Sequence, residues 1–275
     1  MARLTAQQIV DRIRSRSAGT WTEPSLDGFS AGRPDTVVTG IATSFAPSIS
    51  VLNQAVGEGR NLIITQQPAF YLPGAQGDLL RNDPATLAKQ EIINRHGLVV
   101  WRFTDNWNNR AVDGQLLGLA KFLGWDKYHI AEAGTAGDEA YNARAKYFRL
   151  PETTLGAIVR HIEGPLNVRG IRVIGGPSTK VRKASLSHGM FSLTELRQIL
   201  KDPDVDLVMA AEAVEWESVE HFRDLLTWGK KKGMILLGRA ASEDPGYGEA
   251  AAWLKGIVPE VPVRWIPVTE PFWVP

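Results

Sequence analysis

The sequence lacks cysteine altogether, and histidine is scarce. Without a thiol the chain forms no disulfide, no thiolate nucleophile and no cysteine metal site. The five histidines are spread along the chain, and none of them falls in a cluster: His96, His129, His161, His188 and His221. A site for Zn²⁺, Fe or Ni normally uses imidazole or thiolate ligands. The residue chemistry alone therefore does not predict a transition-metal site.

The chain also lacks a strong charge and any long hydrophobic run. The net charge is +1, which gives no electrostatic reason to expect nucleic acid or an acidic membrane surface as a partner. No stretch approaches the roughly 18 apolar residues of a membrane span. Residues 1–16 have no apolar core of the kind that a signal peptide needs. We therefore expect a soluble, cytoplasmic protein with no membrane partner.

What the sequence does contain is a strand–helix–strand pattern between residues 37 and 71. Residues 37–42 and 62–64 are runs of mainly apolar residues, typical of buried strands. Between them, Pro47 fits the first turn of a helix, and Gly57 and Gly59 favour its end. Such a unit of about 30 residues predicts a pair of parallel strands joined by a crossover helix.

The same alternation of helices and strands continues along the chain. Capping patterns predict helices that begin after Thr5, Asp83 and Ser192. Further helices are expected at 113–123, 151–163 and 245–254, with strands at 98–101, 171–174, 205–209, 234–237 and 261–266. The fold class that this predicts is α/β, with two lobes built on mainly parallel or mixed sheets. We expect residues 1–125 and 200–275 to form the core lobes, with 126–199 as an intervening segment that begins the second lobe.

Polar residues follow four of the predicted strands. The clusters are Gln66 and Gln67; Thr104, Asp105 and Asn108; Glu212 and Glu215; and Arg239 and Glu243. Ligands of open α/β sheets bind at the carboxyl ends of the strands. If both lobes bring these ends together, the clusters line one cleft. The alternative for the two glutamines is a solvated loop before Pro68.

The order of these motifs resembles a known family. The matching segments are GIATSFAPSISVLNQAVGEGRNLIITQQPAFY, VVWRFTDNWN, VMAAEAVEWE, LLGRAASEDPG and VPEVPVRWIPVTEPFWVP, which together span nearly the whole chain. They resemble the Nif-three-like family, also called the dinuclear-metal-centre hexameric proteins or GTP cyclohydrolase I type 2 homologues. The resemblance implies two α/β lobes around a central cleft that holds two metal ions, and a homo-oligomer, often a hexamer.

The chain departs from the family where the family places histidine. Gln66 and Gln67 stand where the first motif usually has two histidines, or histidine and glutamate. The second motif keeps Asp105, but its three histidine positions hold Thr104, Asn106 and Asn108.

In the last motif, Arg239 replaces histidine, and Glu243 is kept. A fixed positive charge at that place opposes a cation and can pair with a carboxylate instead. The resemblance and its departures therefore imply a degenerate metal centre, with no cofactor expected.

Three functions remain open at this point, and whether the protein is an enzyme is among the open questions. The first is binding of a small polar or nucleotide-like ligand in the cleft. The second is metal-dependent hydrolysis, of the GTP cyclohydrolase or phosphoester type, in which Asp105, Glu212 and Glu243 would hold Mn²⁺, Mg²⁺ or Zn²⁺. The third is a structural oligomer or interaction module, which the apolar C-terminal tail and nine tryptophans allow.

Overall fold

The computed structural model describes residues 3–17, 21–71, 80–110, 113–130, 145–168, 170–268 and 271–272. Contacts divide the chain into two compact units. Unit 1 comprises Met1–Gly118 and Asp244–Val268, and unit 2 comprises Leu119–Glu243 and Thr269–Pro275. Residues 200–243, which the sequence analysis grouped with residues 1–125, thus lie in unit 2 together with the segment 126–199.

Unit 1 is built on a five-stranded sheet. Its strands are β1 (Gly28–Ala31), β2 (Ile41–Ser44), β3 (Leu62–Thr65), β4 (Val99–Arg102) and β13 (Val263–Trp265), in the order β1-β4-β3-β2-β13. All neighbouring strands are parallel except β1, which pairs with β4 in the antiparallel sense. The predicted parallel pair is confirmed, since β2 and β3 pair in register from Ile41–Leu62 to Ser44–Thr65. Its first strand, however, begins at Ile41 and not at residue 37 as predicted.

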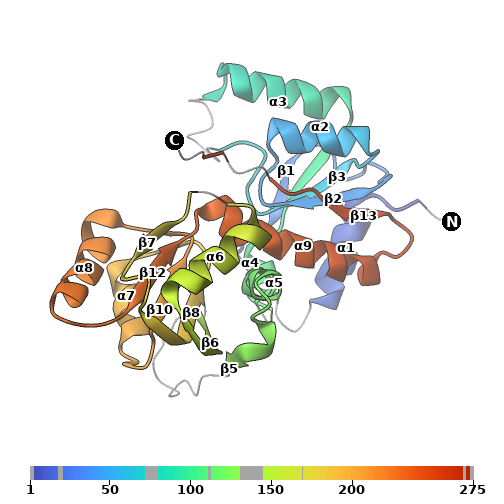
Figure 1. Cartoon of the computed structure of the whole chain (residues 1–275). Helices are drawn as coiled ribbons and strands as arrows, with labels where there is room; N and C mark the ends of the chain where they lie inside the picture. The colour runs from blue at the N-terminus through green and yellow to red at the C-terminus, as the bar shows by residue number, and fades with distance from the viewer. Residues whose placement is uncertain are drawn as a thin grey trace. The chain divides into compact units, whose positions relative to one another are not determined.

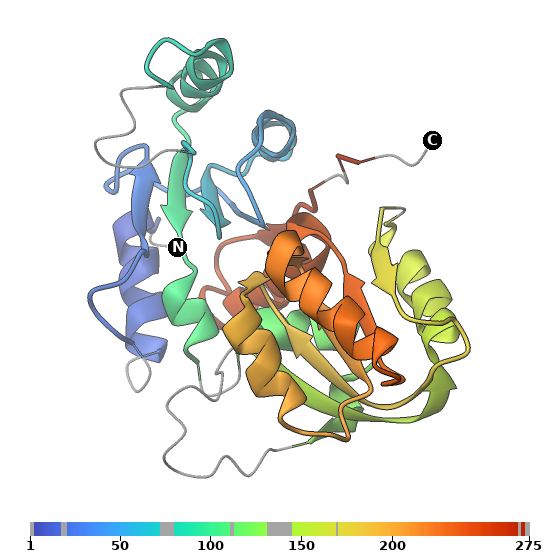
Figure 2. The ribbon, with the colours of Figure 1, turned by 90° about the vertical axis from the view of Figure 1, so that its left-hand side faces the viewer.

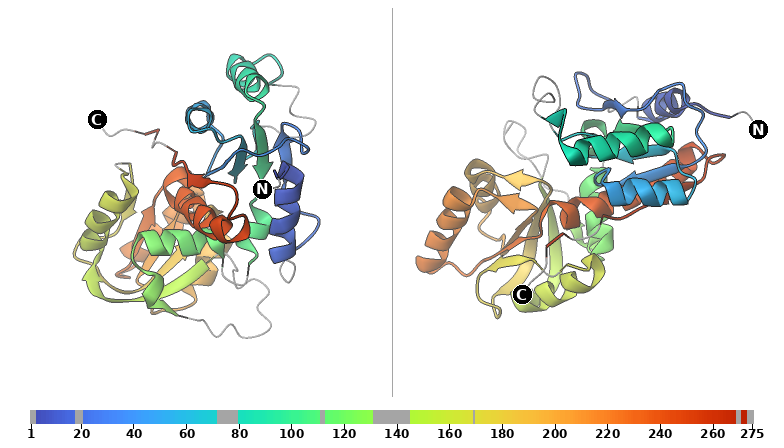
Figure 3. Two further views of the ribbon diagram at one scale, coloured as in Figure 1. Left: turned by 90° about the vertical axis from the view of Figure 1, so that its right-hand side faces the viewer. Right: turned by 90° about the horizontal axis from the view of Figure 1, so that it is seen from above.

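Helices cover both faces of this sheet. They are α1 (Ala6–Arg16), α2 (Ile49–Gly57), α3 (Pro84–Arg95) and α9 (Arg239–Ile257). The short α4 (Asp105–Asn108) follows β4, and α5 (Gly114–Phe122) contains the boundary between the two units. Successive strand residues point to opposite faces, so that Ile64 and Trp101 pack in the cluster that includes α1 and α9. Ile63 and Val100 pack instead with α2 and α3, two helices that lie side by side (Figure 1, and Figure 3, right).

Unit 2 is built on a second, mixed sheet. Its strands are β5 (His129–Ile130), β6 (Ala145–Thr154), β7 (Arg172–Ile174), β8 (Lys180–Ser187), β10 (Leu207–Ala210) and β12 (Gly233–Leu236), in the order β5-β6-β8-β10-β12-β7. The central strands β8, β10 and β12 are parallel, and the outer strands run antiparallel to their neighbours. A separate pair of short strands, β9 (Met190–Phe191) and β11 (Glu212–Ala213), is also parallel.

In the described residues of unit 2, three helices and two irregular turns accompany the sheet. These are α6 (Leu155–Leu166), α7 (Leu193–Leu200), α8 (Glu220–Thr227), the 3₁₀ turn η2 (Asp126–Tyr128) and the π turn η3 (Glu215–Val219). One face of the sheet packs Val208 and Leu236 against apolar residues of α7 and α8, such as Leu196 and Phe222. Figure 2 shows α7 and α8 on this face. The predicted α/β fold with mixed sheets is therefore confirmed.

The predicted helix caps are confirmed as well. Thr5 and Gln8 form a reciprocal capping box at α1, and Ser192 and Glu195 form one at α7. Asp83 accepts a hydrogen bond from the backbone of Thr86 at the start of α3. These contacts involve residues three apart, which is why local sequence predicts them.

Three helix boundaries were predicted wrongly. Pro47 lies before the N-cap Ser48 and so outside α2. Residues 151–154 belong to β6, because their cross-strand pairing with β8 outweighs the local helix pattern, and α6 then runs through Pro165.

The last helix begins at Arg239, six residues before the predicted Pro245. Pro245 is the seventh residue of α9, where a proline cannot donate to the carbonyl four residues before it, and the helix nevertheless continues through it. At 19 residues α9 is also the longest helix. None of the helices in the described residues is both long and apolar enough to cross a membrane.

Candidate functional site

The second predicted cluster lies at and within α4, directly after β4, and Asp27 binds the N-terminus of this helix. The Asp27 carboxylate accepts hydrogen bonds from the backbone N–H groups of Thr104 (2.6 Å), Asp105 (3.0 Å) and Asn106 (2.9 Å). A carboxylate at a helix N-terminus satisfies free N–H groups and complements the helix dipole. In return, Asp105 Oδ2 accepts a 2.7 Å bond from the backbone N–H of Leu26. The Asp105 carboxylate thus has a structural partner within unit 1.

Asn106 occupies one of the positions where the resemblance implies a histidine. Its side chain is fully buried. The amide nitrogen donates to Asp27 Oδ2 and to the carbonyl of Thr22, and the amide oxygen accepts a 2.6 Å bond from the Thr22 backbone N–H. The amide therefore ties α4 to the segment before β1.

The first predicted cluster lies at the carboxyl end of β3. Gln66 is buried, and its carbonyl accepts a 2.9 Å hydrogen bond from Arg102 Nε. The backbone N–H of Gln67 donates to the carbonyl of Phe45, and its carbonyl accepts from Thr65 Oγ1. The backbones of both glutamines are therefore fixed to the sheet, so the solvated-loop alternative is wrong for Gln66.

Two buried polar side chains at this edge of the sheet have an atom without a hydrogen bond. Within the described residues, Ser44 Oγ, Gln66 Oε1 and Asn108 Oδ1 are buried and have no partner. Ser44 ends β2 and pairs with Thr65 of β3, immediately before Gln66. Most buried polar groups in proteins are hydrogen-bonded, so each exception needs an explanation. Ser44 and Gln66 lie at the carboxyl ends of neighbouring strands, where α/β sheets bind ligands. Asn108 ends the short helix α4, and other such atoms lie elsewhere in the described residues.

The last predicted cluster is an ion pair at the start of α9. Arg239 is the first residue of the helix, and Gly238 before it adopts a positive φ of 82°. Glu243 lies one turn further on, so both side chains share a face of the helix. Arg239 Nε lies 2.8 Å from Glu243 Oε1, and the Glu243 side chain is fully buried. The turn at Gly189 passes beside both residues.

The third cluster divides between two partners. Arg239 Nη1 lies 4.0 Å from Glu212 Oε2, so Glu212 joins the ion pair at longer range. Glu215 is exposed and pairs instead with Arg172 of β7. Of the two glutamates, only Glu212 is therefore brought to Arg239 and Glu243.

Asp244 is a further buried carboxyl group, which the sequence analysis did not single out. It lies in unit 1, where Oδ1 accepts a 2.7 Å bond from the Phe45 backbone N–H and Oδ2 a 3.1 Å bond from that of Val268. Burial raises its pKa to about 7, although these two hydrogen bonds and one from Trp265 oppose the shift. The side chain links the start of α9 to the ends of β2 and β13.

The sequence analysis also missed Asp27 and Gly189. Asp27 lies 77 residues before Thr104, and Gly189 lies about 50 residues before Arg239. No local pattern marks either residue, because their partners come from other strands. The expectation that clusters from both lobes face one cleft stays a prediction.

Within each unit, the predicted site residues do not fit a metal ion. Asp105 accepts a backbone hydrogen bond, Glu243 lies against a guanidinium, and Glu215 pairs with Arg172. Among the described residues, no three histidine or acidic side chains gather in a group that could hold a metal ion. Within unit 2, a cation held by Glu212 or Glu243 would also lie close to the fixed charge of Arg239.

Comparison with solved structures identifies the fold. A Bacillus cereus protein related to NIF3 is 15% identical, with a TM-score of 0.76 and full coverage of both chains. Staphylococcus aureus hypothetical protein SA1388 is 14% identical with a TM-score of 0.76, covering 99% of this chain and 100% of its own. Protein ybgI, of unknown function, is 15% identical with a TM-score of 0.74, covering 98% of this chain and 100% of its own. No family model matches the sequence, and no curated protein matches it.

The chain therefore has the fold of the NIF3-related proteins, which confirms the predicted Nif-three-like resemblance at the level of the fold. Sequence identities near 15% support a shared fold but not a shared activity. The function has to be argued from the side chains of this chain.

Proposed function

We propose that this protein is a NIF3-like fold in which the dinuclear metal centre is degenerate, and that it binds a small polar ligand in place of metal ions. The observation that supports this most directly is the contact between Arg239 and the fully buried carboxylate of Glu243. A buried carboxylate needs a compensating positive charge. In a metal site the cation supplies that charge, whereas here the guanidinium supplies it.

The ligand site that we propose is the carboxyl edge of the first sheet. A buried amide or hydroxyl oxygen without a hydrogen bond costs about 1 to 3 kcal/mol. Two such atoms, on Ser44 and Gln66, lie at this edge, and a third, on Asn108, lies at the end of the short helix α4. A ligand with N–H or O–H donors, such as the edge of a nucleotide base, would satisfy them and recover that free energy.

Calorimetric titration with Mn²⁺, Zn²⁺ and Mg²⁺ tests the first half of the proposal. We expect no binding heat in the micromolar range, because no described group of acidic and histidine side chains could hold an ion. Tight binding would favour the alternative, a metal-dependent hydrolase using Asp105, Glu212 and Glu243. Assays on GTP and phosphoesters would then follow.

Thermal shift with guanosine and GTP tests the second half. We expect either compound to raise the melting temperature of the wild type but not that of Gln66→Leu, which keeps the shape and removes the amide. Asn53→Leu on the exposed face of α2 is the matched control. Equal shifts in Gln66→Leu and the wild type would contradict the proposed site.

A second candidate function is a structural homo-oligomer, such as the hexamer that the family resemblance implies. Its support is the exposure of two tryptophans in unit 2, Trp216 at 79% and Trp228 at 75%. Exposed apolar surface of this kind indicates an interface where it forms a contiguous patch. Assembly and ligand binding are compatible with each other. A cytoplasmic location stays a prediction.

A further inference from the structure

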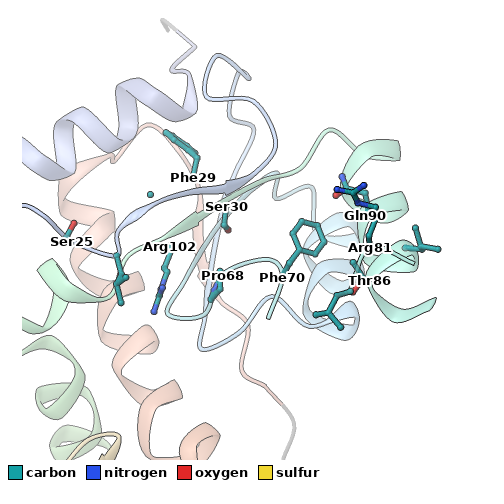
Figure 4. A pocket seen from close by; sticks show the side chains of 13 residues that line it. Ser25, Phe29, Ser30, Pro68, Phe70, Arg81, Thr86, Gln90 and Arg102 are labelled. Atoms are coloured by element: carbon teal, nitrogen blue, oxygen red, sulfur yellow. The ribbon is translucent and has the colours of Figure 1, made fainter. Parts of the chain in front are cut away.

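Unit 1 contains a hollow that the proposed function does not use. Its volume is about 700 Å³, within the range of small-molecule sites. It is lined by residues around β1, the end of β4, the segment after β3 and the first half of α3, among them Ser25, Leu26, Pro68, Phe70, Leu87 and Arg102 (Figure 4). None of the three unsatisfied residues Ser44, Gln66 and Asn108 lines it.

Arg102 is the polar group that distinguishes this hollow. It is the last residue of β4 and is half buried. Its Nε donates to the Gln66 carbonyl, which fixes the plane of the guanidinium. Among the described residues, no acidic side chain pairs with it. In Figure 4 the guanidinium lies between Ser25 and Pro68 at the hollow. A half-buried guanidinium held in one orientation is suited to bidentate recognition of a carboxylate or phosphate.

The acidic residues next to the hollow are used elsewhere. Asp27 accepts from the N-terminus of α4, Asp83 caps α3, and Glu91 pairs with Arg95. The lining residues in the described part of the chain include Arg81 and Arg102 but no aspartate or glutamate. The charge of Arg102 is therefore one that no acidic residue of the described lining neutralises.

The remaining wall is largely apolar and partly open to water. Leu26 and Leu87 are 60% and 52% exposed, and Phe70 and Pro68 lie on the same hollow. Apolar side chains grouped around a cavity gain free energy when a ligand covers them. The hollow thus offers an apolar surface next to a cationic end.

From this arrangement we propose that the hollow binds a small molecule with an anionic head and an apolar body. Arg102 takes the head group, a carboxylate or a phosphate monoester, through its two free Nη groups. Leu26, Phe70 and Leu87 cover the apolar body. This hollow and the ligand site proposed above, at the carboxyl edge of the unit 1 sheet around Gln66, share no side chain. The failure of one proposal therefore does not imply the failure of the other.

Calorimetry with three eight-carbon probes tests the proposal. We expect octanoate or octyl phosphate to bind the wild type, and 1-octanol to bind at least tenfold more weakly because it lacks the charge. The stronger of the two anions identifies the head group. Binding of 1-octanol as tight as that of both anions would overturn the assignment of Arg102.

Variants locate the binding. Arg102→Gln should weaken the anion at least tenfold, whereas Arg95→Gln, on the exposed face of α3, should leave it unchanged. If Arg102→Gln does not fold, Leu87→Asp places a negative charge at the hollow on an exposed position and should weaken the anion equally. Asn53→Asp on α2 is its control for net charge. Equal affinity in Leu87→Asp and Asn53→Asp would contradict the site.

Discussion

Arg239 lies in the first turn of α9, where the helix dipole is unfavourable for a cation. The residue is tolerated there because Glu243 and Glu212 lie 2.8 Å and 4.0 Å from its guanidinium. Glu243 needs a positive charge in its turn, since its side chain is fully buried. Each charge of the pair therefore stabilises the other. In the family resemblance, Arg239 stands in place of a histidine and Glu243 is the acidic residue that is kept.

Arg239→Met should therefore destabilise the protein. Removing the guanidinium leaves a buried carboxylate without its countercharge, at a cost of about 2 kcal/mol, reduced from the value for fully buried pairs because Arg239 is 34% exposed. The double variant Arg239→Met/Glu243→Gln should recover most of this loss. Urea denaturation measures both, and Arg182→Met, in an exposed pair with Glu152, is the control. Equal stability of Arg239→Met and the wild type would show that the pair does not stabilise the site.

Asp244 should give the protein an unusual dependence on pH. Its folded pKa, about 7, lies above the ordinary value of 3.8, so between these values the folded state holds a proton that the unfolded state has lost. The contribution is present at low pH and is lost as the pH rises through 7.

Asp244→Asn, which cannot titrate, should therefore gain about 2 to 3 kcal/mol of unfolding free energy relative to the wild type between pH 5 and pH 8. Denaturation at several pH values measures the difference. Between pH 8 and 9 the difference in unfolding free energy between the two proteins should stay constant. A constant difference from pH 5 to 8 would show that burial does not raise this pKa.

At the scale of single elements, α4 depends on Asp27. A helix of four residues has no intrinsic stability, and Asp27 supplies hydrogen bonds to three of its free N–H groups. Asp27→Ala should cost about 2 kcal/mol, and Asp27→Asn less, since its amide oxygen still accepts. Asp35→Ala, in an exposed pair with Arg33, should change little by the same denaturation assay. If Asp27→Ala matched that control, α4 would be held by other contacts.

The elements that local sequence predicts are those whose signals lie within a few residues. The capping boxes at Thr5 and Ser192 and the strands of the parallel unit are of this kind. The start of α9 and the end of β6 depend on contacts distant in sequence, and both were predicted wrongly.

The same distinction applies to the candidate site. The polar positions after the strands could be predicted, because strand ends are visible in the sequence. Their partners could not. Asp27, Gly189 and Asp244 each act on residues that lie tens or hundreds of positions away. Arg102 appeared only as part of a motif, since nothing local indicates the hollow beside it.

At the scale of the whole molecule, assembly is the property that the exposed tryptophans suggest. Size-exclusion chromatography with light scattering should give a mass that is a multiple of 30.2 kDa, six times that value for a hexamer. Replacing Trp216 and Trp228 by serine should shift the mass toward the single chain if these side chains lie between subunits. A wild type that elutes as a monomer would remove the structural oligomer from consideration.

The degenerate metal centre is the central claim, and the metal content of the native protein tests it most directly. Protein purified without a histidine tag should contain far less than one equivalent of Zn, Fe, Mn or Ni by elemental analysis. That result would direct the search for ligands to the two proposed sites in unit 1, the sheet edge around Gln66 and the hollow beside Arg102. One or two equivalents of any of these metals would contradict the claim and establish that carboxylates and amides suffice to hold them.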